Sequence, residues 1–166
     1  MKKIIVVLAL TVPVLGGLLV AAGGAGGGGG APEMEVTKDP ALLVSPTAQV
    51  GNLTVYGVKL GDPVEKIPNN AAVTRQPSDR PQDAIYSGRN VSYSAFDGKI
   101  YHIRVQGEIA RAMPPYNAVR LQMLLGKADE VTQPDESATA LSYFGRHVQF
   151  TCGRGKLVTA VDLYVP

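Results

Sequence analysis

The sequence has no tryptophan, one cysteine and two histidines among its 166 residues. A single cysteine excludes an intramolecular disulfide framework. Neither His102 nor His147 has a histidine or cysteine neighbour at the spacing of a zinc site, and the Asp-x-Asp-x-Asp-Gly spacing of a calcium loop is absent. The sequence therefore predicts no metal, no cofactor and no catalytic residues, and it favours a non-enzymatic role over an enzymatic one.

After Lys2 and Lys3, the start of the chain contains no charged residue. The segment Ile4–Val20 is uncharged, and the small residues after it include Gly26–Gly30. A short basic start, an apolar stretch and small residues form the layout of a secretory signal peptide. The sequence predicts that residues 1–22 are a signal peptide or a membrane anchor. We expect an exported protein, periplasmic or extracellular, that stays tethered to the membrane where the anchor is retained.

The rest of the chain has no excess of either charge. Beyond residue 32 it carries 14 Lys and Arg against 14 Asp and Glu. A nucleic-acid-binding protein needs a concentrated basic face, so nucleic acid is not an expected partner. Residues 23–47 are rich in glycine and proline and are predicted to be a flexible linker. Residues 48–166 are then the folded domain.

This domain contains an internal match. Residues 87–93 (Ser-Gly-Arg-Asn-Val-Ser-Tyr) align with residues 144–150 (Phe-Gly-Arg-His-Val-Gln-Phe). At the same separation of 57 residues, the Gly-Lys-Ile of 98–100 aligns with the Gly-Lys-Leu of 155–157. A shared spacing over two motifs favours duplication over coincidence.

The match predicts an α+β domain of two similar halves, about residues 48–107 and 108–166. Each half reads as a helix followed by an antiparallel β-meander, with the helices, near 62–67 and 115–125, packed on one face of the sheet. Alternating apolar residues between turn signals predict the following strands: 53–60, 84–86, 91–96, 100–105, 139–143, 147–152 and 157–165. The last strands of the two halves match less well, because Ile103 and Val105 share one face whereas Leu157, Val161 and Leu163 suggest the other parity. This difference predicts a bulge or a one-residue slip between the halves there.

Cysteine and the carboxylates are the remaining candidates for catalysis. Strand alternation buries Cys152 and turns His147, five residues away, to the opposite face. We therefore expect an inert core thiol, matched in the first half by Ala95. Carboxylates that only the fold would bring together, such as Asp97 and Asp162, are the basis of an alternative function, a small secreted hydrolase.

Two short segments resemble those of known exported α+β domains. They are 57–67 (Gly-Val-Lys-Leu-Gly-Asp-Pro-Val-Glu-Lys-Ile) and 124–131 (Leu-Leu-Gly-Lys-Ala-Asp-Glu-Val). The similar families are the small outer-membrane assembly lipoproteins and the tandem-repeat β-lactamase inhibitor proteins. This chain has neither a lipid-acceptor cysteine near its start nor the inhibitors' paired cysteines. The resemblance covers roughly residues 53–166 and implies a binding or scaffolding role in the cell envelope.

Four residues are the candidates for binding. Arg89 and Arg146 occupy matching turns beside glycine, where they could form paired anion contacts at one end of the sheet; the alternative is that both are solvated turn residues. Tyr93 and Tyr101 are amphipathic rings of the kind that anchor recognition surfaces. The predicted function is an exported, non-enzymatic binding or scaffold module of the cell envelope that contacts a protein partner. Besides the hydrolase, the other alternative is an inhibitor of a secreted hydrolase that acts through the loop 68–83.

Overall fold

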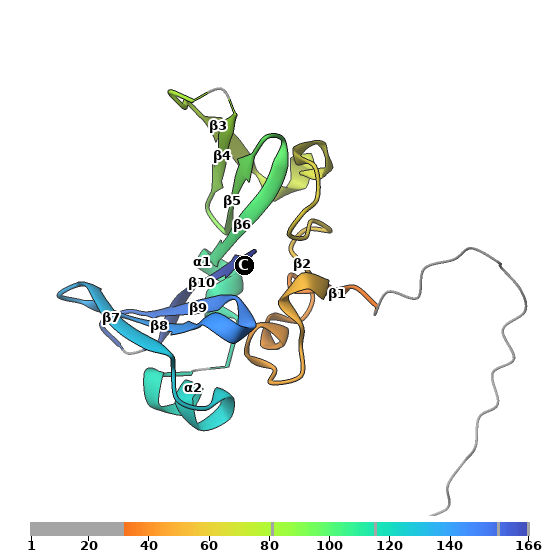
Figure 1. Cartoon of the computed structure of the whole chain (residues 1–166). Coiled ribbons are helices and arrows are strands. Elements are labelled where there is room, and N and C mark those ends of the chain that lie inside the picture. Colours follow the sequence, from red (N-terminus) through yellow and green to blue (C-terminus); the bar gives the residue numbers. More distant parts are fainter. Residues whose placement is uncertain (1–31, 81, 115, 156, 166) are drawn as a thin grey trace, which may run out of the picture. The chain divides into compact units, whose positions relative to one another are not determined.

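The computed structural model describes residues 32–80, 82–114, 116–155 and 157–165 (Figure 1). This part of the chain is mostly antiparallel β-sheet with few helices. The predicted signal peptide or anchor, residues 1–22, lies outside the described residues. Within the described ranges, no helix combines the length and the apolar character needed to cross a membrane.

Eight strands form one sheet in the order β3-β4-β5-β6-β10-β9-β8-β7, and every neighbouring pair is antiparallel. The first four strands and the last four strands are each joined in sequence order, and the two sets meet where β6 pairs with β10 (Figure 1). The strands are β3 Val73–Gln76, β4 Asp83–Gly88, β5 Val91–Phe96, β6 Lys99–Gln106, β7 Glu130–Asp135, β8 Ala138–Tyr143, β9 Val148–Cys152 and β10 Val158–Tyr164.

Six of these strands were predicted to within two residues at each end, and the two edge strands were not predicted. β3 lies inside the predicted loop 68–83, and three of its four residues are exposed. All six residues of β7 are exposed, and Pro134 interrupts its row of backbone hydrogen-bond donors because proline has no N–H. Edge strands such as these bury no face, so they leave no alternating pattern in the sequence.

Alternation along the inner strands builds the core. On β5, Val91, Tyr93 and Ala95 are buried, and Ser92 and Ser94 between them are not. Cross-strand pairing continues this inward face over the sheet through a row that comprises Val91, Val105, Val161, Phe150 and Leu141. The pairing of β10 with β9 shifts register between Val158 and Ala160, and the pairing of β5 with β6 shifts register between Ser94 and Ala95.

The helices are shorter than expected. The predicted helix 115–125 is α2, Ala118–Leu125, which starts after Asn117 because the Asn117 side chain accepts a hydrogen bond from the Arg120 amide at 2.8 Å. α1, Gly107–Arg111, follows β6 directly. Single turns of 3-10 helix lie at Pro40–Val44, Val50–Asn52, Val64–Lys66, Asn69–Ala71 and Phe144–Arg146. The other predicted helix, near 62–67, is the single 3-10 turn Val64–Lys66, because Pro63 and Pro68 flank it.

The prediction of a flexible linker over 23–47 is wrong for its described part. β1, Met34–Glu35, pairs in parallel with β2, Leu53–Thr54, as a separate two-stranded sheet. The following segment contributes Val36, Leu43 and Val44 to the hydrophobic core. Its prolines suggested a linker, but three buried aliphatic side chains tie the segment to the domain.

Glu35 is the residue that fixes this segment. Its carboxylate accepts hydrogen bonds from the amide and hydroxyl of Thr37, from the Thr54 hydroxyl at 3.0 Å, and from the amides of Tyr56 and Gly57 at 3.0 and 2.8 Å. Tyr56 and Gly57 have positive φ angles, 55° and 76°, in the turn that offers these two amides. Partial burial acts to raise the pKa of Glu35, but hydrogen bonds from Thr37, Gly57 and Thr54 lower this pKa overall.

We expect the Cys152 thiol to react slowly in the native protein, because it is buried and burial raises its pKa. Labelling by a maleimide should accelerate by more than about a hundredfold on unfolding. In a Cys152→Ser background, Ala95→Cys should also label slowly and Ser78→Cys, in an exposed loop, should label fast. Fast native labelling of Cys152 would contradict the strand register.

Replacement Glu35→Gln should lower the free energy of unfolding at neutral pH by about 1–3 kcal/mol, because an uncharged amide cannot accept all of these hydrogen bonds. Since the folded-state pKa is depressed, this stabilisation is complete above the unfolded-state pKa and is lost as the pH falls through the folded-state pKa. Urea unfolding at a series of pH values should show the two proteins converging in acid. Glu33→Gln, which removes only the exposed pair with Lys59, is the control and should change little.

Candidate functional site

The face of the sheet opposite the core carries a continuous polar row. We call this the outer face. One residue of each strand contributes to the row, and cross-strand pairing connects them in register: Thr74, Ser87, Ser92, Arg104, Asp162, Gln149, Ser142 and Glu130. On the six inner strands the adjacent inward residues are apolar and largely buried, so the period-two alternation separates a dry face from a wet one there, whereas the edge strands β3 and β7 are exposed on both faces.

A charge cluster lies at the centre of the row, where the two sets of strands meet. Asp162 on β10 is only 6% exposed. Arg104 stands opposite it on β6 and donates to both carboxylate oxygens, at 3.0 and 2.9 Å. His102 Nε2 lies 3.0 Å from Asp162 Oδ1. A carboxylate at this depth is costly without partners, and the bidentate guanidinium supplies the compensating charge.

Ser94 extends this cluster, because its Oγ lies 3.5 Å from His102 Nδ1. A serine, a histidine and an aspartate in succession is the order of groups in a hydrolase triad. Here, however, the aspartate charge is already engaged by Arg104, and none of the three main cavities lined by described residues includes Ser94, His102 or Asp162. The cluster lies on the outer face of the sheet, apart from these cavities.

The structure does not bring Asp97 and Asp162 together, as the hydrolase alternative requires. Asp97 lies in the turn between β5 and β6, with a φ angle of 49°. Asp162 is opposite Arg104, five residues along β6 from Lys99, which is a separation of about 16 Å along the strand. Strand geometry thus keeps these two carboxylates apart.

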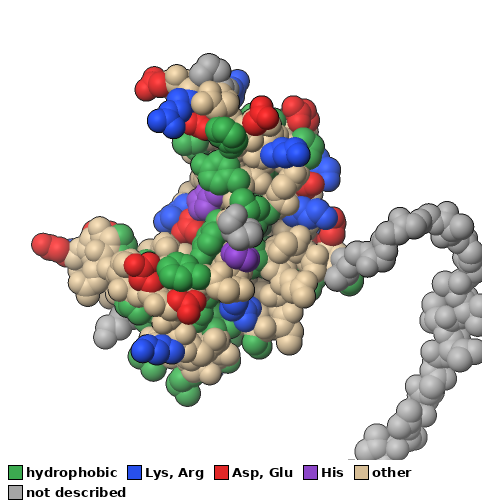
Figure 2. Space-filling view, viewed as in Figure 1, with side chains coloured by type: hydrophobic (Ala, Val, Ile, Leu, Met, Phe, Trp, Pro, Cys, Tyr) green, Lys and Arg blue, Asp and Glu red, His purple; other side chains and the backbone are tan. Residues whose placement is uncertain are grey.

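Apolar side chains interrupt the outer face beside the charge cluster. We define the apolar strip as Ile85, Phe96 and Tyr101 of this face together with Val165, which follows β10 directly; the four are 41–55% exposed. Ile85 is paired with Ser94, and Ser94 with His102, so the strip borders the cluster. The Val165 amide donates to the Tyr101 carbonyl at 3.0 Å. In Figure 2, hydrophobic side chains lie next to histidine side chains over the middle of the view.

Of the two predicted tyrosines, Tyr101 belongs to the strip and Tyr93 does not. Tyr93 is fully buried, and its hydroxyl donates to the Val55 carbonyl at 2.8 Å. Burial raises the pKa of Tyr93 well above its usual range. The expectation that Tyr93 binds a partner is therefore wrong, because it lies on the inward parity of β5 together with Val91 and Ala95.

Arg89 and Arg146 do not meet at one end of the sheet, so the two do not form the paired anion contact that their matching turns suggested. The turn of Arg89 adjoins the end of β6, where the Gln106 amide donates to the Asn90 carbonyl. The turn of Arg146 adjoins the end of β10, near Tyr164. Because β6 and β10 are antiparallel, matching turns of the two sets of strands lie at opposite ends of this central pair.

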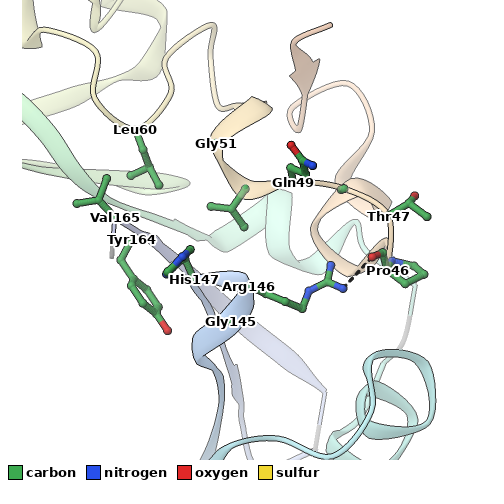
Figure 3. A pocket seen from close by; sticks show the side chains of 12 residues that line it. Pro46, Thr47, Gln49, Gly51, Leu60, Gly145, Arg146, His147, Tyr164 and Val165 are labelled. Carbon is green, nitrogen blue, oxygen red and sulfur yellow. Dashed lines mark hydrogen bonds between the residues drawn. The ribbon is translucent and has the colours of Figure 1, made fainter. Parts of the chain in front are cut away.

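Each arginine has a different partner. Arg89 forms an exposed ion pair with Glu108 at 3.2 Å. The Arg146 guanidinium donates to the backbone carbonyls of Ser45 and Pro46, at 2.5 and 3.0 Å, and lines a cavity of about 600 Å³ (Figure 3). No sequence pattern pointed to this cavity, since one wall belongs to the segment that was expected to be a linker.

The comparisons with known proteins add little. No family model and no curated protein matches this chain. Among solved structures, it is similar to the crystal structure of a DUF4309 family protein, YjgB, from Bacillus subtilis, with a TM-score of 0.40 and 19% sequence identity over 67% of this chain and 73% of that chain. At this level the neighbour assigns neither a family nor a function. In the described ranges there is no group of three or more His, Cys, Asp or Glu side chains that could hold a metal ion.

Replacement Asp162→Asn should lower the free energy of unfolding by about 1–3 kcal/mol, because it leaves Arg104 without its carboxylate at a partly buried position. Glu108→Gln removes the carboxylate of the exposed pair with Arg89 and should cost less than about 0.5 kcal/mol. Urea unfolding followed by circular dichroism measures both values. Equal effects of the two replacements would contradict a structural role for the central cluster.

Proposed function

We propose that the domain is a non-enzymatic module that binds a protein partner through the apolar strip of its outer face. The observation that carries the proposal is the exposure of Ile85, Phe96 and Tyr101 on a sheet face that is otherwise polar. Protein interfaces combine a few aromatic or aliphatic anchors with a polar surround. The charge cluster of His102, Arg104 and Asp162 provides such a surround on one side of the strip.

The strip also has the rigidity that favours binding. Its residues belong to strands that are hydrogen-bonded on both sides, or follow β10 directly, so few conformations are lost when a partner docks. Anchors on a preformed sheet lose less entropy than anchors on a loop, which supports a recognition surface over a chance exposure of apolar side chains.

We place this activity outside the cytoplasm, in the cell envelope or the extracellular space. This part of the proposal is supported by the sequence of residues 1–22, with its basic start and its uncharged Ile4–Val20. The two routes, cleavage and retention as an anchor, both deliver the domain to the same side of the membrane.

We also propose that the domain arose by duplication of one half, with the helices covering the inner face of the sheet. The symmetrical strand order supports this origin, as do the matching burial of Ala95 and Cys152 and the internal sequence match. Ile109 of α1 and Leu121 of α2 belong to the same hydrophobic cluster as the inward residues of the strands, which supports the covering role of the helices.

The proposed function is tested by affinity capture from the envelope fraction of the producing organism with matched variants. The double replacement Phe96→Ser and Tyr101→Ser should weaken binding of the captured partner at least about tenfold, because it removes two anchors. The control, Val119→Ser and Met123→Ser, removes two apolar side chains of α2 that are 68% and 81% exposed, and it should bind as the unmodified protein does. Binding that survives loss of the strip, or is lost equally in the control, would contradict the proposal.

A further inference from the structure

The cavity beside Arg146 has the size and the lining of a small-molecule site. Its volume of about 600 Å³ falls in the range of ligand pockets. Four stretches of the chain converge on it: the segment 46–51, Leu60, the turn before β9, and the end of β10 (Figure 3). It borders the apolar strip only at Val165, so a ligand here would be separate from a partner docked on Phe96 and Tyr101.

The wall of the cavity is divided by chemistry. Pro46, Val50, Leu60 and Val165 present aliphatic surface, and the polar side chains are those of Thr47, Gln49, Arg146, His147 and Tyr164. All five polar side chains can donate a hydrogen bond. No aspartate or glutamate lines the cavity. The wall therefore offers positive charge and donors next to an apolar surface, with no negative charge to oppose an anion.

The positive charge of Arg146 is not neutralised by a carboxylate in the described part of the chain. Its two terminal nitrogens donate to backbone carbonyls, which orient the guanidinium but leave its full charge in place. Its Nε is buried and has no hydrogen-bond partner among the described residues. Because Arg146 carries an uncompensated positive charge in a partly apolar cavity, the cavity favours an anionic ligand.

The local backbone makes this cavity in advance of any ligand. His147 has a φ angle of 54°, which ends the turn Phe144–Arg146 and sets its ring edge-on to Tyr164, with 5.9 Å between ring centroids. Burial raises the pKa of Tyr164, so its hydroxyl stays protonated and able to donate at neutral pH. The opposite wall is fixed because Val44 and Val50 are in the core. Such a site binds without first ordering its walls.

We infer that this cavity binds an organic carboxylate that carries a compact hydrophobic group. The carboxylate faces Arg146 and the neighbouring donors, and the hydrophobic group lies against Val50 and Leu60. The same chemistry is found in a free small acid and in the last residue of a peptide with an apolar side chain. Both sources present a carboxylate within a few bonds of an apolar group, and the binding measurements separate them.

Titration of the purified protein by isothermal calorimetry tests the inference with two probes, 4-phenylbutyrate and the dipeptide N-acetyl-Leu-Phe, each compared with its uncharged amide. At least one acid should bind at least about tenfold more tightly than its amide, since the charged contact is worth that much. Tighter binding of the dipeptide acid identifies a peptide end as the source, and tighter binding of 4-phenylbutyrate identifies a free acid. If neither acid is preferred over its amide, the inference is overturned.

Variants locate the effect in the cavity. Arg146→Gln should remove the preference for the acid, but it also removes the hydrogen bonds to Ser45 and Pro46. Gln49→Glu keeps those hydrogen bonds and adds a negative charge to the wall of the cavity. It should weaken binding of the acid at least about tenfold and leave the affinity for the amide unchanged. Arg89→Gln, at the matching turn without this cavity, is the control and should retain the full preference. A preference that survives Gln49→Glu, or that Arg89→Gln abolishes, would place binding elsewhere and overturn the inference.

Discussion

The pairing of β6 with β10 is the constraint on which the rest of the domain depends. It joins two sets of four strands into one sheet, and its register is fixed from both faces. On the inner face Ile103 meets Leu163 in the core, while on the outer face Arg104 meets Asp162. A slip of β10 by one residue would turn Asp162 inward, away from Arg104, and Leu163 outward, away from Ile103, so the alternative registers are strongly disfavoured.

The same pairing explains why the two sets of strands differ in surface chemistry. Because it is antiparallel, it sends matching turns to opposite ends of the sheet, and the N-terminal segment reaches only one of them. There Arg146 binds the carbonyls of Ser45 and Pro46 and a cavity forms. At the other end Arg89 remains exposed beside Glu108. The surroundings of the two similar turns therefore differ, because the described part of the N-terminal segment contacts the turn of Arg146 and does not contact the turn of Arg89.

Local patterns in the sequence predicted the bounds of the inner strands well, but they did not predict which strands lie side by side in the sheet. The bounds of β5 were predicted correctly, because alternation from Val91 to Phe96 ends at Asp97 and Gly98, whose positive φ angles make the hairpin turn. The same alternation places Tyr93 on the buried face with Val91 and Ala95, although tyrosine is frequent at interfaces. Which strand lies beside β6 is set by long-range pairing, so neither the Arg104–Asp162 contact nor the separation of the two arginine turns could be derived from local residue types.

Two other features escaped prediction for physical reasons. The N-terminal segment was judged by its prolines, whereas its place is decided by Glu35, whose hydrogen-bond partners lie up to 22 residues away. The apolar strip combines residues of β4, β5 and β6 with Val165, and only the pairing of the strands makes them one surface. Both depend on contacts between distant parts of the chain.

The central claim, that the apolar strip contacts a protein partner, is tested most directly by photocrosslinking in cells of the producing organism. A p-benzoylphenylalanine in place of Tyr101 keeps an aromatic ring in the strip, and the same group in place of Val119 reports on the exposed surface of α2. The account predicts a discrete crosslinked product from position 101 and none from position 119. A product from position 119 alone would contradict it and would move the interface to α2.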